Sequence, residues 1–134
     1  MVKSISRDLI RKYLDDLNYS TRVDDDGDIF TILRADKDFN HDVIIFFTVD
    51  KNWLGIYGYA IDYDVDSSNM GRVMLSINEY NKNSKVLKAF LENNHIRFEQ
   101  FFLLDEEVSE EYIKANCIKL TAGLIWKSFC DFNK

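Results

Sequence analysis

The most prominent candidates for chemistry are the acidic residues Asp62, Asp64 and Asp66, which alternate along the chain. They match positions one, three and five of the EF-hand loop, whose carboxylate oxygens bind calcium. That loop also needs a glycine at position six and a bidentate glutamate at position twelve, and this chain has Ser67 and Val73 there. The spacing therefore predicts an acidic loop at the start of a helix, without a calcium site.

A second acidic run, residues 24–28, contains Gly27. If Gly27 takes position six of the same loop, Arg22 falls at position one and Leu33 at position twelve, and neither can act as the required ligand. Asp26 and Gly27 are instead typical of the tight turn of a β-hairpin. We interpret this run as a solvated turn.

Nucleophilic or metal chemistry has few residues to draw on. The only histidines are His41 and His95, and neither stands at a metal-ligand spacing from Cys117 or Cys130. No G-x-S-x-G sequence accompanies them, and the five glycines do not form a phosphate-binding loop. We therefore predict no catalytic residue, no metal and no cofactor. An enzyme that uses paired carboxylates stays open as a minor alternative.

The two cysteines and the chain's first residues indicate a compartment. Cys117 and Cys130 lie in one predicted helix, where a separation of roughly 20 Å rules out a bond between them. Free thiols fit a reducing compartment, and the N-terminal residues are charged where a signal peptide is apolar. The longest uncharged stretch, residues 52–61, is far shorter than the ~20 residues of a membrane-spanning helix. We expect a cytoplasmic protein without membrane contact.

Length and composition fit one folded domain over residues 1–134. Hydrophobic residues make up 46% of the chain, which is enough to build a core without disulfides or metals. The formal net charge of −6 works against nucleic-acid binding, since that requires cations to replace phosphate counterions. A nucleic acid is therefore not expected as a partner.

The periodicity of apolar residues predicts an α+β domain with an antiparallel sheet and three helices. The order is one helix, three or four strands, a second helix, two strands and a last helix. Residues 85–92 fit a helical period as well as a strand, and we predict a strand because residues 96–104 need a hairpin partner. The predicted helices span residues 6–18, 70–83 and 109–132, and the predicted strands span residues 19–23, 29–33, 43–49, 53–63, 85–92 and 96–104.

Five aromatic residues in the predicted strands could line a binding face or a pocket. Aromatic side chains in strands are more often core residues and cross-strand pairs, so we assign most of them to the core. They are Phe46, Phe47, Trp53, Tyr57 and Tyr59.

The last predicted helix carries two apolar stripes when its residues are placed at 100° intervals. One stripe, expected to face the sheet, contains Ile113, Cys117, Leu120 and Leu124. The second stripe points elsewhere, and a neighbouring helix could cover it. If none does, we predict that it is a partner interface, because soluble proteins rarely expose large apolar patches. The residues predicted for that interface are Ile118, Ile125, Phe129 and Phe132.

Specific residues within this order of elements resemble the YbjN family. They are Ile5-Ser6-Arg7-Asp8, the hairpin at Asp25-Asp26-Gly27-Asp28, Asn78-Glu79-Tyr80-Asn81 and the closing helix with Trp126. The resemblance covers nearly the whole chain and implies a fold similar to the class I type III secretion chaperones. It also implies a sensory-transduction regulator with no assigned chemistry. The chaperones that the family resembles in fold are small acidic homodimers that hold other polypeptides.

The leading functional prediction is a non-enzymatic module that binds another polypeptide, chaperone-like or regulatory, and forms a homodimer or part of a complex. The alternative is a small-molecule sensor with a pocket between the sheet and the helices.

Overall fold

Six strands form one antiparallel sheet in the computed structural model, which describes residues 1–132. Their order across the sheet is β1-β2-β3-β4-β6-β5, so the first four strands form a meander and the last two form a hairpin added beside β4. The strands are β1 (Thr21–Val23), β2 (Ile29–Leu33), β3 (Val43–Asp50), β4 (Trp53–Asp64), β5 (Lys88–Glu92) and β6 (His95–Leu103).

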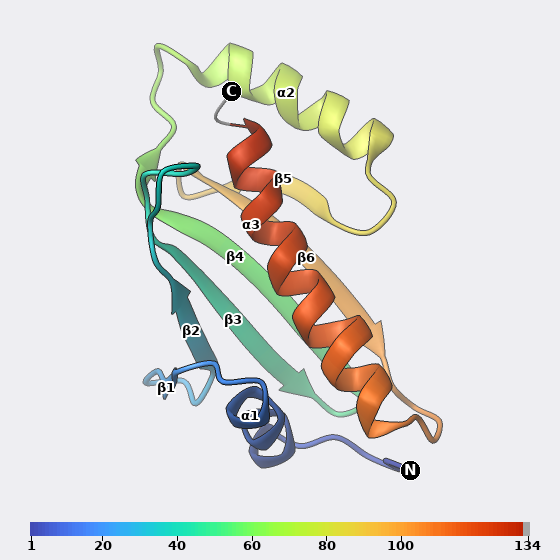
Figure 1. Ribbon diagram of the computed structural model, residues 1–134. Helices are drawn as coiled ribbons and strands as arrows, with labels where there is room; N and C mark the ends of the chain where they lie inside the picture. Colours follow the sequence, from blue (N-terminus) through green and yellow to red (C-terminus); the bar gives the residue numbers. More distant parts are fainter. Residues whose placement is uncertain (133–134) are drawn as a thin grey trace.

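Three helical segments accompany the sheet, and they confirm the predicted α+β class and order. They are α1 (Arg7–Asp16), α2 (Met70–Asn83) and a last helix in two parts, η1 (Tyr112–Lys119) and α3 (Leu120–Phe132). The last helix crosses one face of the sheet diagonally (Figure 1). Helix α1 packs against β1, β3 and η1, and α2 packs against β5. No helix within residues 1–132 is both long and apolar enough to cross a bilayer.

Local sequence fixes the helix starts. The Ser6 hydroxyl accepts a hydrogen bond from the Leu9 amide at 3.1 Å, which satisfies one of the free amides at the start of α1. In the same way, the Ser109 hydroxyl accepts from the Tyr112 amide at 3.0 Å, as the sequence predicted. Asp66 instead orders the loop before α2, because its carboxylate accepts hydrogen bonds from the amides of Ser68 and Asn69.

The hairpin that the sequence left ambiguous is present as β5 and β6. Only residues 88–92 are a strand, so the expected strand at 85–92 is three residues too long. Helix α2 ends at Asn83, and the residues that follow form a loop with a buried Leu87 and an exposed Val86. A helical spacing of apolar residues arises here because Val86 and Leu87 lie in the loop, while Phe90 and Leu91 belong to the strand.

The first part of the last helix is a π-helix, in which the Leu120 amide donates to the carbonyl of Ala115, five residues earlier. A π-helix rotates less per residue than the roughly 100° of an α-helix. In a uniform α-helix Ile113 and Ile125 would point about 120° apart. Both are fully buried here, because underwinding by about 15° per residue over η1 brings them into phase.

The underwinding of η1 therefore brings residues of both predicted stripes onto one buried face. For some of these residues the observed orientation is the reverse of the predicted one. Leu120, which was expected to face the sheet, is half exposed. Ile118, Ile125 and Phe129, which were expected to point elsewhere, have no exposed surface. Phe129 lies against Phe98 of β6, with ring centroids 4.8 Å apart.

Gly58 allows this close approach of helix to sheet. A Cβ atom at Gly58 would lie 2.9 Å from the Cγ2 atom of Ile125 in α3. The glycine in the middle of β4 is thus the position where α3 crosses the sheet.

Candidate interaction surface

The helices cover one side of the sheet, and the other side has no layer over it. We call this second side the open face; it consists of the strand residues that alternate with the buried ones. Their side chains are half-buried or exposed, in contrast to the fully buried Val43, Ile45 and Phe47 on the helix side of β3. The open face contains Phe30 and Ile32 of β2, Ile44, Phe46 and Thr48 of β3, Tyr57 and Tyr59 of β4, Phe90 of β5, and Arg97, Glu99, Phe101 and Leu103 of β6.

A continuous aromatic row runs across the middle of the open face. Strand register places Phe30 opposite Phe46 and Phe46 opposite Tyr57. The ring centroids of Phe30 and Phe46 are 5.5 Å apart, and those of Phe46 and Tyr57 are 5.0 Å apart and nearly parallel. Each ring thus packs against its neighbour and still presents surface to solvent.

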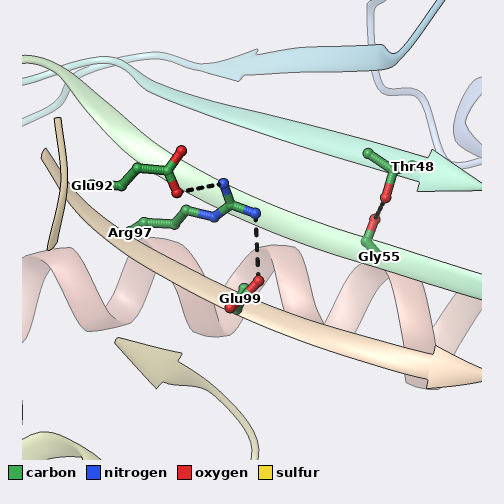
Figure 2. A network of polar contacts seen from close by, with 5 residues as sticks. All are labelled: Thr48, Gly55, Glu92, Arg97 and Glu99. Carbon is green, nitrogen blue, oxygen red and sulfur yellow. Dashed lines mark hydrogen bonds and ion pairs between the residues drawn. The ribbon is translucent and has the colours of Figure 1, made fainter. Parts of the chain in front are cut away.

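Arg97 continues this row on β6. Its guanidinium carbon lies 3.6 Å from the centre of the Tyr57 ring, which is a cation–π contact. Its two terminal nitrogens lie 3.1 Å from Glu92 Oε2 and 3.4 Å from Glu99 Oε2 (Figure 2). Arg97 is therefore held flat against the aromatic row, and its charge is balanced by two carboxylates.

Acidic groups surround the aromatic row. Burial raises the pKa of the Tyr57 phenol; nearby Asp28 and Asp24 raise it further, and Arg97 opposes them. Tyr57 therefore stays a neutral phenol near neutral pH. Asp24 accepts hydrogen bonds from the amides of Asp26 and Asp28, which fixes the acidic β1–β2 turn beside the row.

Towards the β3–β4 turn the open face contains a hollow of about 390 Å³ around Gly55, lined by Thr48, Trp53 and Phe101. The Thr48 hydroxyl donates to the Gly55 carbonyl at 3.4 Å (Figure 2). Trp53 is 45% exposed and Phe101 is 49% exposed. Exposed aromatic side chains around a hollow are typical of surfaces that bind other proteins.

A second hollow, of about 510 Å³, lies between the edge of the sheet at β2 and the last helix. Tyr19, Arg34, Gly123 and Trp126 contribute to its wall. Its volume is in the range of small-molecule sites. It corresponds in position to the pocket between sheet and helices that the alternative sequence prediction requires.

The residues that the sequence singled out for chemistry have structural roles here. Asp66 orders the loop before α2, and the hydrogen bonds that it accepts from Ser68 and Asn69 lower the pKa of its carboxyl. His95 Nδ1 lies 3.1 Å from Asp64 Oδ1, and the His95 ring stacks on Tyr59. Within residues 1–132, no three acidic, histidine or cysteine side chains come together as metal ligands.

Cys117 and Cys130 form no disulfide with each other. Burial raises the pKa of the Cys117 thiol to about 11, so it is protonated at neutral pH and unreactive as a nucleophile.

The predicted partner interface on the last helix needs a correction. Ile118, Ile125 and Phe129 are fully buried within the chain, and Phe132 packs against Tyr80 and Phe98. Ile118, Ile125 and Phe129 are core residues and are not accessible to a partner, whereas Phe132 is partly buried. The apolar surface is on the opposite side of the sheet, where sequence reasoning had assigned Phe46, Tyr57 and Tyr59 mostly to the core.

The fold and this surface define a class of protein: an α+β domain with helices on one side of its sheet and an aromatic surface on the other. A family model for YbjN, described as "putative bacterial sensory transduction regulator", matches residues 6–117. The chain therefore belongs to the YbjN family, a family described as regulators.

Structural comparison agrees with this assignment. The crystal structure of YbjN from E. coli, described as "a putative transcription regulator", superposes with a TM-score of 0.75 at 16% sequence identity. The match covers 96% of this chain and 92% of that one, so the two share their fold over almost their whole length. No curated protein matches the chain.

Proposed function

We propose that this protein is a non-enzymatic regulatory module that binds another polypeptide on the open face of its sheet. The observation that supports the proposal is the continuous row of Phe30, Phe46, Tyr57 and Arg97 on a face that no other part of residues 1–132 covers. A chaperone-like role, as in the type III secretion chaperones that the sequence resembles, is one form of this function.

Charge indicates the kind of polypeptide. Asp24 lies near Tyr57 of the aromatic row, and Asp25 and Asp26 follow it in the same turn. None of these three residues forms an ion pair with any described residue, and the whole chain carries −6. Arg and Lys side chains of a partner can stack on the exposed tyrosine and phenylalanine rings and meet these carboxylates. The fitting partner is an amphipathic segment with apolar side chains on one side and basic residues at its margins.

Synthetic peptides test this proposal. Three peptides with the same apolar pattern carry lysine and arginine, glutamate, or serine at the marginal positions. We expect the basic peptide to bind most tightly and its affinity to fall as salt is raised. A single affinity for all three peptides would contradict the proposal.

A double variant, Phe30→Thr with Tyr59→Thr, removes two rings of the open face and keeps residues that favour strands. It should lose at least tenfold in affinity for the basic peptide, since a few aromatic anchors carry most of the binding energy. Leu75→Thr is the matched control, because Leu75 is 72% exposed on α2, away from the sheet. Equal losses in both variants would refute a site on the open face.

The second candidate function is a small-molecule sensor, which the 510 Å³ hollow beside Trp126 favours. Gly123→Leu tests it, since a Cβ at Gly123 meets no atom within 4 Å and the larger side chain can enter the hollow. A metabolite that raises the melting temperature of the wild type and not of this variant would support a sensor. A metabolite that stabilises both proteins equally does not bind in this hollow.

A further inference from the structure

One arginine of the chain itself shows how the open face holds a guanidinium group. The guanidinium carbon of Arg97 lies 3.6 Å from the centre of the Tyr57 ring and 5.3 Å from the centre of the Phe90 ring. Glu92 and Glu99 supply carboxylate oxygens at 3.1 and 3.4 Å from its terminal nitrogens. Aromatic rings with carboxylates at their margin thus hold this cation by stacking and by charge together.

The hollow around Gly55, on the same face of the sheet, is built from the same kinds of group. Trp53 and Phe101 supply two exposed rings, and Asp50 supplies a carboxylate. Among residues 1–132, no lysine or arginine lies over either ring or pairs with Asp50. The neighbouring Lys51 is exposed and forms neither contact. These rings and this carboxylate are therefore available to a cation from another molecule.

Strand register brings the three side chains of the hollow to one side of the sheet. Asp50 lies opposite Trp53 in the β3–β4 pair, and Gly55 lies opposite Phe101 in the β4–β6 pair. Residues two apart on a strand point to the same face, so Trp53 shares its face with position 55. An indole, a phenyl ring and a carboxylate therefore meet around a residue that has no side chain of its own.

Gly55 keeps this hollow open. A Cβ atom at residue 55 would lie 2.5 Å from Thr48 Oγ1 and 2.6 Å from Phe101 Cε1, so the edge of the Phe101 ring lies where another residue would place its side chain. The Thr48 hydroxyl also donates to the Gly55 carbonyl, which ties β3 to β4 at the floor of the hollow (Figure 2). A glycine inside a strand often marks a place where another group approaches the backbone closely.

We propose that this hollow receives the side chain of an arginine residue in the polypeptide that binds the open face. The guanidinium group stacks on the indole of Trp53, the ring type that attracts cations most strongly, and donates hydrogen bonds to the Asp50 carboxylate. The aliphatic part of the arginine packs on Phe101. Arginine fits better than lysine, because its planar group can stack on a ring and bind a carboxylate at the same time. The inference rests on the proposed function, since it assigns one residue of the bound segment.

Two small probes test the chemistry of the hollow. One is N-acetyl-arginine N-methylamide, and the other is the matching citrulline compound, which has a similar planar group without the charge. Each is titrated to tens of millimolar into the isotope-labelled full-length protein, and NMR follows the two indole N–H signals, which Trp53→Leu assigns. We expect the arginine probe to shift the signal of Trp53 and not that of Trp126, and the citrulline probe to bind at least about fivefold more weakly. Equal binding of the two probes, or no shift of Trp53, would overturn the proposal.

Asp50→Asn tests the carboxylate, because it removes the charge and keeps the size of the side chain. It should weaken binding of the arginine probe by about two- to fivefold, as expected for one exposed ion pair. Asp38→Asn is the matched control, since Asp38 is also exposed and lies in the loop before β3, whereas Asp50 is the last residue of that strand. Circular dichroism establishes that both variants are folded. Equal weakening in both would show an effect of net charge alone and would contradict the site.

The three synthetic peptides separate this inference from the function on which it rests. The basic peptide should bind the Trp53→Leu protein at least about threefold more weakly than the wild type. If the basic peptide binds more tightly than the serine peptide and Trp53→Leu has no effect, the open-face function stands and the arginine site is refuted. If the arginine probe binds at Trp53 and the three peptides share one affinity, the arginine site stands and the proposed function fails.

Discussion

Gly58 is the position where the packing of helix on sheet makes the clearest prediction. Its replacement by alanine adds one methyl group, which would lie 2.9 Å from Ile125 Cγ2, 3.1 Å from the Ile44 carbonyl oxygen and 3.3 Å from Ile45 Cγ1. The carbonyl belongs to the backbone of β3, so it cannot move without disturbing the pairing of β3 with β4. Ile125 must therefore shift, and α3 with it.

The magnitude follows from two opposing terms. Forcing an extra methyl group into a packed core costs about 1–3 kcal/mol, whereas alanine gains about 0.4–1 kcal/mol by restricting the unfolded chain. We expect Gly58→Ala to lower the free energy of unfolding by about 1–2 kcal/mol. For a chain of this size, the melting temperature should fall by roughly 4–8 °C.

Urea denaturation followed by tryptophan fluorescence measures this loss. Ile125→Ala alone should cost about 2–5 kcal/mol, because Ile125 is fully buried. In the double variant the methyl group at residue 58 enters space that Ile125 has vacated, so the two losses should sum to at least ~0.5 kcal/mol more than the measured loss. A Gly58→Ala protein as stable as the wild type, or strictly additive losses, would refute the role assigned to Gly58.

Four further predictions concern single residues. Gly123→Ala should raise the free energy of unfolding by about 0.5–1 kcal/mol, because the added methyl group meets no atom within 4 Å and alanine favours a helix more than glycine does. A lower free energy of unfolding in urea would contradict this. Asp66→Ala should lower the melting temperature at neutral pH. The difference from wild type should disappear as the pH falls through the pKa of the Asp66 carboxyl, which lies below the usual aspartate range. A difference in melting temperature that grows in acid would show that the sign is wrong. Cys117 should resist alkylation in the native protein at pH 8 and react at once in urea, as mass spectrometry of labelled peptides can establish; rapid native labelling would disprove its burial. Arg97→Met should keep the fold and increase the quenching of tyrosine fluorescence by acrylamide, because the guanidinium no longer covers Tyr57; unchanged quenching would show that the contact is absent in solution.

The sequence predicted the elements with strong local signals. Helix α2 has the predicted bounds, and β2 does as well, because apolar periodicity and turn residues agree at their ends. Residues 85–92 were harder to interpret, since Leu87 is buried from a loop and mimics a helical spacing with the strand residues after it.

The last helix shows a limit of reasoning from a helical wheel. A constant rotation of about 100° per residue separates Ile113 from Ile125, and the separation suggested two faces with two partners. The π-helical hydrogen bonds of η1 remove that separation, and the residue sequence itself has no marker for them. The predicted interface was wrong at Ile118, Ile125 and Phe129 for this reason.

The open face could be predicted only in part. Strand β3 is apolar at every position from Val43 to Phe47, and such a run is typical of a strand covered on both sides. Which of its neighbours share a face depends on strand register, which joins residues far apart in the chain, such as Phe46 with Tyr57 and Tyr57 with Glu99. Arg97 lies in a predicted strand, and nothing in its neighbourhood along the chain indicates a contact with Tyr57.

The underwound segment η1 also determines where the chain can change its length. Loss of one residue between Tyr112 and Lys119 would let this segment wind as an ordinary α-helix. The deletion removes about 100° of rotation, and the return to α-helical winding adds nearly the same amount over the residues that remain. Phe129 would still meet the sheet, about 1.5 Å from its present height along the helix. Loss of one residue from α3, such as Gly123, has no such compensation and would turn Phe129 away from Phe98. The same helix is thus tolerant of a deletion in its first half and intolerant of one in its second.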